Sequence, residues 1–158
     1  MINGWQCGSC PEIQAFTTNQ DLRNAVRDYM DAGGDPEAAV SVTYGHPMGS
    51  WDVSQLDDFS GVCADARFNE DIGQWDVSQG TEFLEMFLGA SSFNQDLSEW
   101  DMSNADDLQW MFNHAESFNG DIRYDESTKI VVSVVLSLLL ESMILTHSLF
   151  WCQSVVGT

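Results

Sequence analysis

Residues 93–103 read FNQDLSEWDMS, and residues 68–78 carry nearly the same text, FNEDIGQWDVS. The first half of this stretch returns at 118–122 as FNGDI, and the second half stands at 49–54 as GSWDVS. Its tryptophans are 24 and 25 residues apart: Trp51, Trp75 and Trp100. Its phenylalanines are 25 residues apart: Phe68, Phe93 and Phe118. A fixed period of this length indicates an array of stacked units that share one core.

Each unit divides into two parts. The part around the tryptophan alternates apolar and polar residues, which predicts a short extended segment or strand. The part that follows places apolar residues at i, i+3, i+4 and i+7, which predicts the buried face of a short helix. These positions are Phe59, Val62, Cys63 and Ala66; Phe83, Met86, Phe87 and Ala90; and Leu108, Met111, Phe112 and Ala115. Acidic residues at the predicted helix starts complement the helix dipole.

Stacking of the units predicts columns of equivalent side chains. The phenylalanines and the tryptophans are expected to form two internal ladders. The column Asn69, Asn94 and Asn119 is expected to point inward and to satisfy backbone groups of loops. Two aspartate columns, Asp71, Asp96 and Asp121 and then Asp52, Asp76 and Asp101, are expected to cap local N–H groups. Calcium bridging is the alternative for these columns, because hard cations favour carboxylate oxygens.

Helical signals precede the array. A capping segment at 17–21 is followed by an apolar stripe of helical spacing, Leu22, Ala25, Val26, Tyr29 and Met30, and Gly33-Gly34 ends that helix. Asp35-Pro36-Glu37 predicts the start of a second, short helix that reaches about Val42. The chain is therefore divided into an N-terminal segment at 1–16, a helical cap at 17–47, about three repeats at 48–122 and a non-repeat segment at 123–158.

The net charge limits the classes of molecule that the protein is expected to bind. The 158 residues hold 25 acids and five basic residues, a formal charge of −20. Such a field repels phosphate backbones and anionic headgroups, so no nucleic-acid partner is expected. The array offers no nucleophile–base pair, glycine-rich phosphate loop or histidine-rich metal cluster, and His46 stands alone before a proline. We therefore expect a non-enzymatic protein without a cofactor.

The N-terminal region contains a cysteine pair that offers a remote alternative function. Cys7 and Cys10 form a C-x-x-C pair, but no second pair completes a zinc site, and Pro11 follows the second thiol. A local disulfide or an idle pair is expected, with thiol–disulfide chemistry as the remote alternative. The start of the sequence has neither a basic region nor an apolar run, so no signal peptide is predicted. Either the protein stays inside the cell or this N-terminus is incomplete.

The repeated text, Phe-Asn-x-Asp-(Ile/Leu)-x-x-Trp-Asp-(Val/Met)-Ser followed by Met-Phe-x-x-Ala, closely resembles the BspA-like leucine-rich-repeat surface proteins. These include the repeat of unknown function found in mycoplasma surface lipoproteins. The resemblance covers about residues 17–122. It implies an α/β fold, a short leucine-rich-repeat-like solenoid with short parallel strands and helices behind an N-terminal helical cap. It also implies cell-surface or secreted placement and adhesion or protein binding, and it carries over no catalytic residues.

The repeat pattern stops after Ile122. Residues 130–151 contain 15 apolar residues among 22, interrupted by Glu141 and several serines. A membrane span needs about 20 predominantly apolar residues. Three interpretations stay open: a cap over the last unit, a weak membrane anchor, and a segment foreign to the domain. Membrane association is expected only through this segment.

The expected function is thus recognition. A protein or another cell-surface macromolecule would contact the acidic, repeat-lined surface, at exposed positions such as Gln74 and Glu99. A calcium-stabilised structural or adhesive element, with Asp71, Asp96 and Asp121 as candidate ligands, is the alternative from another class.

Overall fold

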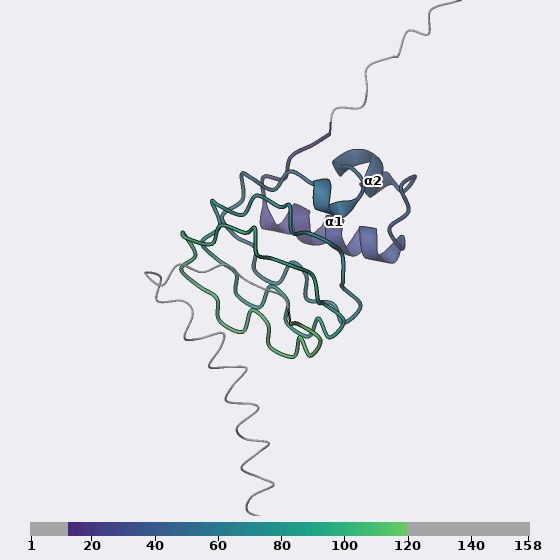
Figure 1. Ribbon diagram of the computed structural model, residues 1–158. Coiled ribbons are helices and arrows are strands. Elements are labelled where there is room, and N and C mark those ends of the chain that lie inside the picture. The colour runs from purple at the N-terminus through teal and green to yellow at the C-terminus, as the bar shows by residue number, and fades with distance from the viewer. Residues whose placement is uncertain (1–12, 120–158) are drawn as a thin grey trace, which may run out of the picture.

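The computed structural model describes residues 13–119. The chain passes through two helices and then winds through three irregular loops that lie side by side in sequence order (Figure 1). We call these loops the first unit (residues 51–74), the second unit (75–99) and the third unit (100–119). The predictions for Cys7 and Cys10, for Asp121 and for residues 130–151 lie outside the described residues.

The first helix forms where the sequence predicts it. Helix α1 spans Asn19–Asp31, and the Thr18 side chain caps its N-terminus by accepting the N–H of Asp21 at 3.1 Å. Its buried side is formed by four residues of the predicted apolar stripe, Leu22, Ala25, Val26 and Tyr29. The chain leaves the helix through Gly33 and Gly34, whose φ angles of 65° and 72° suit glycine.

The second helix starts later than predicted. Helix α2 spans Ala39–Tyr44, and a 3-10 turn, η1, follows at Met48–Ser50. The Asp35-Pro36-Glu37 segment is a turn instead, because the Asp35 carboxylate accepts the Glu37 N–H at 2.9 Å. The Ser41 hydroxyl, the one buried polar side chain among the described residues, donates to the Asp35 carbonyl at 2.8 Å. This bond ties the turn to α2.

The predicted fold class is wrong. Within residues 13–119 the elements are α1, α2 and η1, and the three units contain neither strands nor helices. The β-type pairing between units is limited to two isolated parallel bridges, Asp58 with Glu82 and Glu82 with Asp107. An α/β leucine-rich-repeat-like solenoid built from short parallel strands and helices is therefore not what these residues form.

Consecutive tight turns replace the predicted repeat helices. In the second unit the N–H of Met86 donates to the Phe83 carbonyl at 3.2 Å, and the N–H of Ala90 donates to the Phe87 carbonyl at 3.0 Å. The third residue of each turn has a positive φ: 57° at Glu85 and 70° at Gly89. A helix cannot pass through such residues. Two four-residue turns in succession place apolar residues at i, i+3, i+4 and i+7, as one face of a helix does, which explains the wrong prediction.

The units are joined by backbone hydrogen bonds in a constant register, in which an N–H group donates to the carbonyl just before its equivalent residue in the next unit. Alternate N–H groups of one unit donate to carbonyls of the next, at 2.7–3.0 Å. From the first unit to the second the pairs are Phe59 to Glu82, Gly61 to Leu84 and Cys63 to Met86. From the second unit to the third they are Phe83 to Asp107, Glu85 to Gln109, Phe87 to Met111 and Gly89 to Asn113. Neighbouring units therefore hold each other without forming a sheet.

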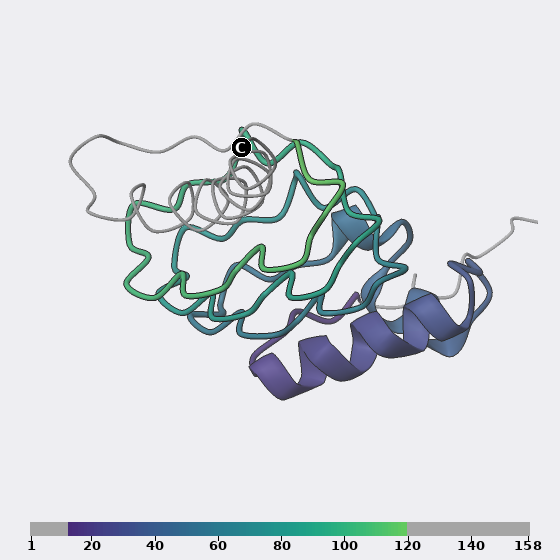
Figure 2. The ribbon, with the colours of Figure 1, turned by 90° about the horizontal axis from the view of Figure 1, so that it is seen from below.

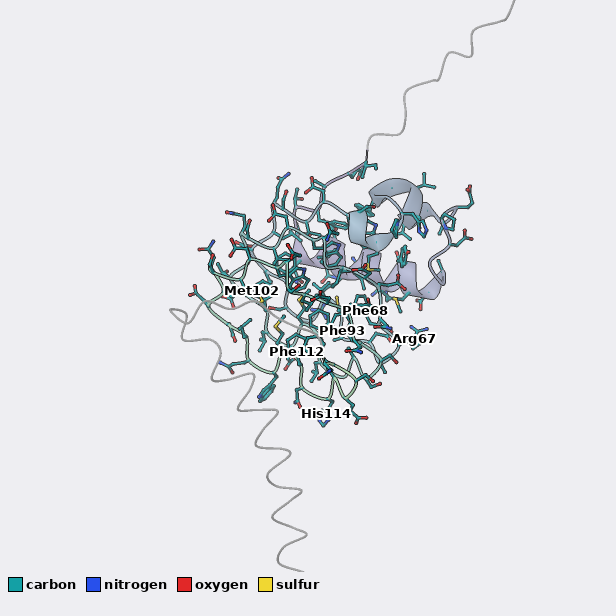
Figure 3. The ribbon with its side chains drawn as sticks, in the orientation of Figure 1. Arg67, Phe68, Phe93, Met102, Phe112 and His114 are labelled. Atoms are coloured by element: carbon teal, nitrogen blue, oxygen red, sulfur yellow. The ribbon has the colours of Figure 1, made fainter. Side chains whose placement is uncertain are left out.

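The core runs through the middle of all three units. The phenylalanine ladder is confirmed: the ring centroids of Phe68 and Phe93 are 5.7 Å apart, and those of Phe93 and Phe118 are 5.6 Å apart. Phe68 and Phe93 lie at the centre of the molecule (Figure 3). Each fully buried phenylalanine contributes about 1.5–3 kcal/mol relative to an exposed one. Apolar burial repeated in every unit stabilises loops that have no regular backbone structure.

The tryptophan ladder is partly as predicted. The rings of Trp51 and Trp75 stack at 6.4 Å, whereas the ring of Trp100 packs against Phe83 and Phe87. All three indoles are buried, and each donates its Nε1–H to a backbone carbonyl earlier in the chain. Trp100 reaches the Ile72 carbonyl at 3.0 Å and so links the third unit to the first.

Helix α1 lies along the first unit, at the end of the row of loops (Figure 2). The Asn19 side-chain amide donates to the carbonyls of Asp58 and Ser60, both at 3.2 Å. These carbonyls are equivalent to those of Glu82 and Leu84, which accept bonds from the preceding unit. Asn19 thus satisfies the backbone groups that the first unit would otherwise leave unpaired.

Candidate binding surface

One face of the row repeats the same exposed polar positions. Around the buried tryptophan of the second unit, Ile72, Trp75 and Val77 are buried, whereas Gln74 and Asp76 are exposed. The exposed members are Asp52, Asp71, Gln74, Asp76, Asp96, Glu99 and Asp101. We call this set the Trp-Asp face. Both residues that the sequence singled out for binding, Gln74 and Glu99, belong to it.

Close backbone contact holds the units together at this face. A Cβ atom on Gly73 would lie 2.8 Å from the Asp96 carbonyl oxygen, and one on Gly49 would meet the carbonyl of Asp71. The indole of Trp75 also donates to the Met48 carbonyl at 3.0 Å. Glycine at these two positions lets the backbone of the next unit approach closely.

Each aspartate on the face is fixed by its own turn. The Oδ1 atoms of Asp52, Asp76 and Asp101 accept the N–H of the serine two residues later, at 3.0–3.1 Å. Asp71 and Asp96 do the same for Gly73 and Ser98. Hydrogen bonds from the Ser103 side chain and N–H lower the pKa of Asp101 below its ordinary value. The predicted capping of local N–H groups is thus confirmed for the five aspartates that the structure describes.

The acids at the predicted helix starts also form such turns. Asp58 accepts the N–H of Ser60 and Asp107 that of Gln109, both at 2.8 Å. The structural role predicted for the asparagines is confirmed, but these side chains are exposed rather than inward. The Oδ1 of Asn69 accepts the Asn94 N–H, and that of Asn94 accepts the Asn119 N–H, both at 2.9 Å.

The calcium candidates do not assemble a metal centre among residues 13–119. No group of three or more His, Cys, Asp or Glu side chains with a metal-binding arrangement occurs there. Asp71 and Asp96 lie on the surface in adjacent units, each turned toward its own backbone, and Asp121 lies outside this range.

Positive charge is scarce on the units. Residues 51–119 contain fifteen acids and one basic residue, Arg67. The Arg67 guanidinium is engaged, because its Nη2 lies 2.9 Å from Asp65 and 3.4 Å from Asp31. Hydrogen bonds from the Arg67 side chain and N–H lower the pKa of the Asp65 carboxyl. Arg67 stands at the periphery in Figure 3, away from the phenylalanine ladder.

The other residues considered from the sequence, Cys63 and His46, take part in packing and hydrogen bonding. Cys63 is fully buried, and burial raises the pKa of its thiol well above the ordinary value. The exposed His46 is bonded through Nδ1 to the Tyr29 hydroxyl at 3.2 Å. Burial raises the pKa of Tyr29, and the charge of Glu70 adds to this effect. No helix among the described residues is long and apolar enough to cross a membrane.

Sequence reasoning missed a second surface, at the open side of the third unit. Leu108, Trp110, Phe112 and His114 are equivalent to the four donors of the second unit, yet within residues 13–119 their N–H groups meet no acceptor. We call these four N–H groups the donor row. The Trp110 side chain is 59% exposed beside it. The only signal in the sequence is that Trp110 does not fall on the position of the ladder tryptophans.

One of three comparisons with known proteins finds a match. A family model described as a Mycoplasma protein of unknown function, DUF285, matches residues 37–137. The match covers more than half of the chain, so the chain belongs to this family. No curated protein and no solved structure shows a significant similarity to it.

Proposed function

We propose that this member of the DUF285 family is a non-enzymatic protein-binding module that engages the basic surface of another macromolecule. The observation that supports it is the Trp-Asp face, where each unit repeats exposed carboxylates in the same place. Fixed carboxylates cost little ordering on binding, because their side chains are already held by turns. One arginine, itself paired, stands among fifteen acids in the units. Such a field attracts cationic partners and repels nucleic acid.

Placement at the cell surface and an adhesive role belong to the same proposal. They rest on the resemblance of the repeats to BspA-like surface proteins. Adhesion suits a chain that repeats one weak contact several times, because linked contacts reinforce each other without new chemistry.

The test removes three of the six negative charges of the Trp-Asp face and keeps the hydrogen bonds of its turns. In the variant Asp52→Asn, Asp76→Asn and Asp101→Asn, each amide oxygen still accepts the serine N–H, but three negative charges are gone. We expect the full chain, immobilised on beads, to lose most of its capture of solubilised membrane proteins from the source cells. Electrostatic capture should also weaken as salt rises.

A matched control removes the same charge elsewhere. The variant Asp21→Asn, Asp28→Asn and Asp31→Asn neutralises three exposed acids of α1. We expect it to capture as well as the unaltered chain. Equal capture by the unaltered chain and the face variant, at unchanged melting temperature, would contradict the proposal.

A further inference from the structure

The asparagine column, Asn69, Asn94 and Asn119, is held by a hydrogen bond that repeats from unit to unit. The Oδ1 atom of Asn69 accepts the Asn94 N–H, and that of Asn94 accepts the Asn119 N–H, both at 2.9 Å. The Gln95 side-chain amide donates to the Asn69 Oδ1 as well, at 3.0 Å. Each bond fixes an exposed side chain to the following unit. The first two members of the column are therefore held in one orientation.

The last member of the column differs from the other two in its neighbours. Within residues 13–119 no following unit donates an N–H group to the Asn119 side chain, which is exposed. The residue after Asn119 in the sequence is Gly120, whereas Glu70 and Gln95 follow the two earlier asparagines. Its position in the array and its neighbour in the sequence thus both set the carboxamide of Asn119 apart.

An asparagine followed by glycine has a reaction available within its own backbone. The amide nitrogen of the glycine attacks the Cγ atom of the asparagine, and a new C–N bond forms. The Cγ–Nδ2 bond breaks, and the Nδ2 group leaves as ammonia with the proton of the attacking N–H. Water then opens either C–N bond of the resulting cyclic imide, which yields aspartate or isoaspartate. Glycine favours the attack because it has no side chain to hinder the approach of its nitrogen.

The hydrogen bonds of the column oppose this reaction in the first two units. The attack requires the asparagine side chain to turn until Cγ lies beside the nitrogen of the next residue. At Asn69 and Asn94 this rotation breaks the bond that Oδ1 accepts from the following unit. The side chains of Glu70 and Gln95 add steric hindrance at the attacking nitrogen. At Asn119 the sequence removes the second obstacle, and the described residues provide no counterpart of the first.

We propose that Asn119 is a site of spontaneous deamidation, which converts it into isoaspartate and aspartate, and that the hydrogen bonds of the column protect Asn69 and Asn94 from the same reaction. The product adds one negative charge to a chain that already carries −20. Isoaspartate also lengthens the main chain by one carbon atom, directly after Phe118 of the phenylalanine ladder. The modification alters charge and backbone at the end of the third unit, independently of the proposed binding function.

The experiment follows the full chain at pH 7.4 and 37 °C. Samples are digested with pepsin in acid, and mass spectrometry with electron-transfer fragmentation assigns each product to a residue. Assignment by residue is necessary because Asn3 also precedes a glycine. We expect Asn119 to lose its amide faster than Asn69 and Asn94 by a factor of about ten or more. Equal rates at the three positions, or an Asn119 that stays intact, would overturn the proposal.

The variant Gly120→Gln tests the proposed chemistry. It gives Asn119 the neighbour that Asn94 has, so we expect deamidation of Asn119 to slow about tenfold. An unchanged rate would show that the nitrogen of the next residue is not the attacking group, and it would overturn the proposal.

The variant Gln95→Gly tests the protection by the column. It makes the sequence around Asn94 equal to that of residues 118–121, Phe-Asn-Gly-Asp, and it keeps the bond from the Asn119 N–H to the Asn94 Oδ1. In the folded variant Asn94 should still react about fivefold or more slowly than Asn119, because the bond must break first. If Asn94 reacts as fast as Asn119, the local sequence alone sets the rate and the protection is refuted.

Unfolding this variant supplies the final control. In concentrated urea the hydrogen bonds of the column are absent, so Asn94 and Asn119 of Gln95→Gly should react at similar rates. A difference that persists in urea would come from the sequence and would contradict protection by the fold. Circular dichroism before incubation verifies that both variants are folded in the absence of urea, as the comparison requires.

Discussion

At the scale of single residues, the units depend on a few backbone positions that L-amino acids seldom adopt. Five residues at the third position of the tight turns in the units have a positive φ, between 55° and 70°. They are Gly61, Glu85, Gly89, Trp110 and His114. Glycine accepts this conformation without steric cost, but a residue with a Cβ loses about 1–2 kcal/mol there. Only two of these five positions hold glycine. The remaining three store strain that the packed core below them offsets.

Two variants measure this strain: one introduces glycine at Glu85, and the other removes glycine at Gly89. Glu85→Gly should raise the free energy of unfolding by about 0.5–1 kcal/mol, since relief of strain exceeds the added flexibility of the unfolded chain. Gly89→Ala should lower it by about 1 kcal/mol. A Cβ at Gly89 meets no atom within 4 Å, so backbone conformation alone is tested there. Urea titrations of both variants give the values; a stabilised Gly89→Ala protein would refute the argument.

These residues also explain the limit of sequence-based prediction. The period, the phenylalanine ladder and the capping aspartates follow from the residues at matched offsets, and the structure confirms them. The predicted repeat helices were wrong, because apolar residues at i, i+3, i+4 and i+7 fit two consecutive turns as well as a helix. Glutamate, tryptophan and histidine at the left-handed positions give no turn signal. The donor row was missed for another reason: an unpaired N–H group leaves no trace in the sequence.

At the scale of elements, the side-chain amide of Asn19 links α1 to the first unit by hydrogen bonds. Asn19 donates to two carbonyls of the first unit, and it is also the first residue of its helix. A carboxylate at the start of a helix is ordinarily favourable, because it faces the positive end of the helix dipole. At Asn19 the same carboxylate would face the carbonyl oxygens of Asp58 and Ser60. The two effects oppose each other, which makes the position informative.

The variant Asn19→Asp should destabilise the protein by about 1–3 kcal/mol, since two partly buried carbonyls lose their donor and gain a repulsive neighbour. Asn19→Ala should cost less, about 0.5–1.5 kcal/mol. Thermal unfolding followed by circular dichroism measures both. Gln20→Glu, at the exposed next residue, is the control for added charge and should change stability little. If Asn19→Asp is more stable than Asn19→Ala, the helix dipole outweighs the lost hydrogen bonds to Asp58 and Ser60, which contradicts this prediction.

At the scale of the whole molecule, self-repulsion is the main electrostatic term. Of the 158 residues, 25 are acidic and five are basic, and the three ion pairs among the described residues are all formed by exposed arginines. Exposed pairs contribute little, about 0–1 kcal/mol each. Salt screens repulsion and attraction alike, so it should favour the folded state of this chain.

We therefore expect the melting temperature to rise between 20 and 500 mM NaCl, by about 2–6 °C if the stabilisation is roughly 1 kcal/mol. Potassium chloride should have the same effect, because screening does not depend on the identity of the cation. Differential scanning calorimetry at pH 7 measures it. A melting temperature that falls with salt would show that ion pairs outweigh repulsion.

The indole bonds have a consequence for how the protein is made. Trp51, Trp75 and Trp100 each bond to a carbonyl that precedes them in the chain, at Gly45, Met48 and Ile72. When one of these tryptophans emerges from the ribosomal exit tunnel, its acceptor has already emerged before it. Each layer can thus lock onto a finished one during synthesis, with no wait for residues still to come. Assembly in the direction of translation is built into the hydrogen bonding of this protein.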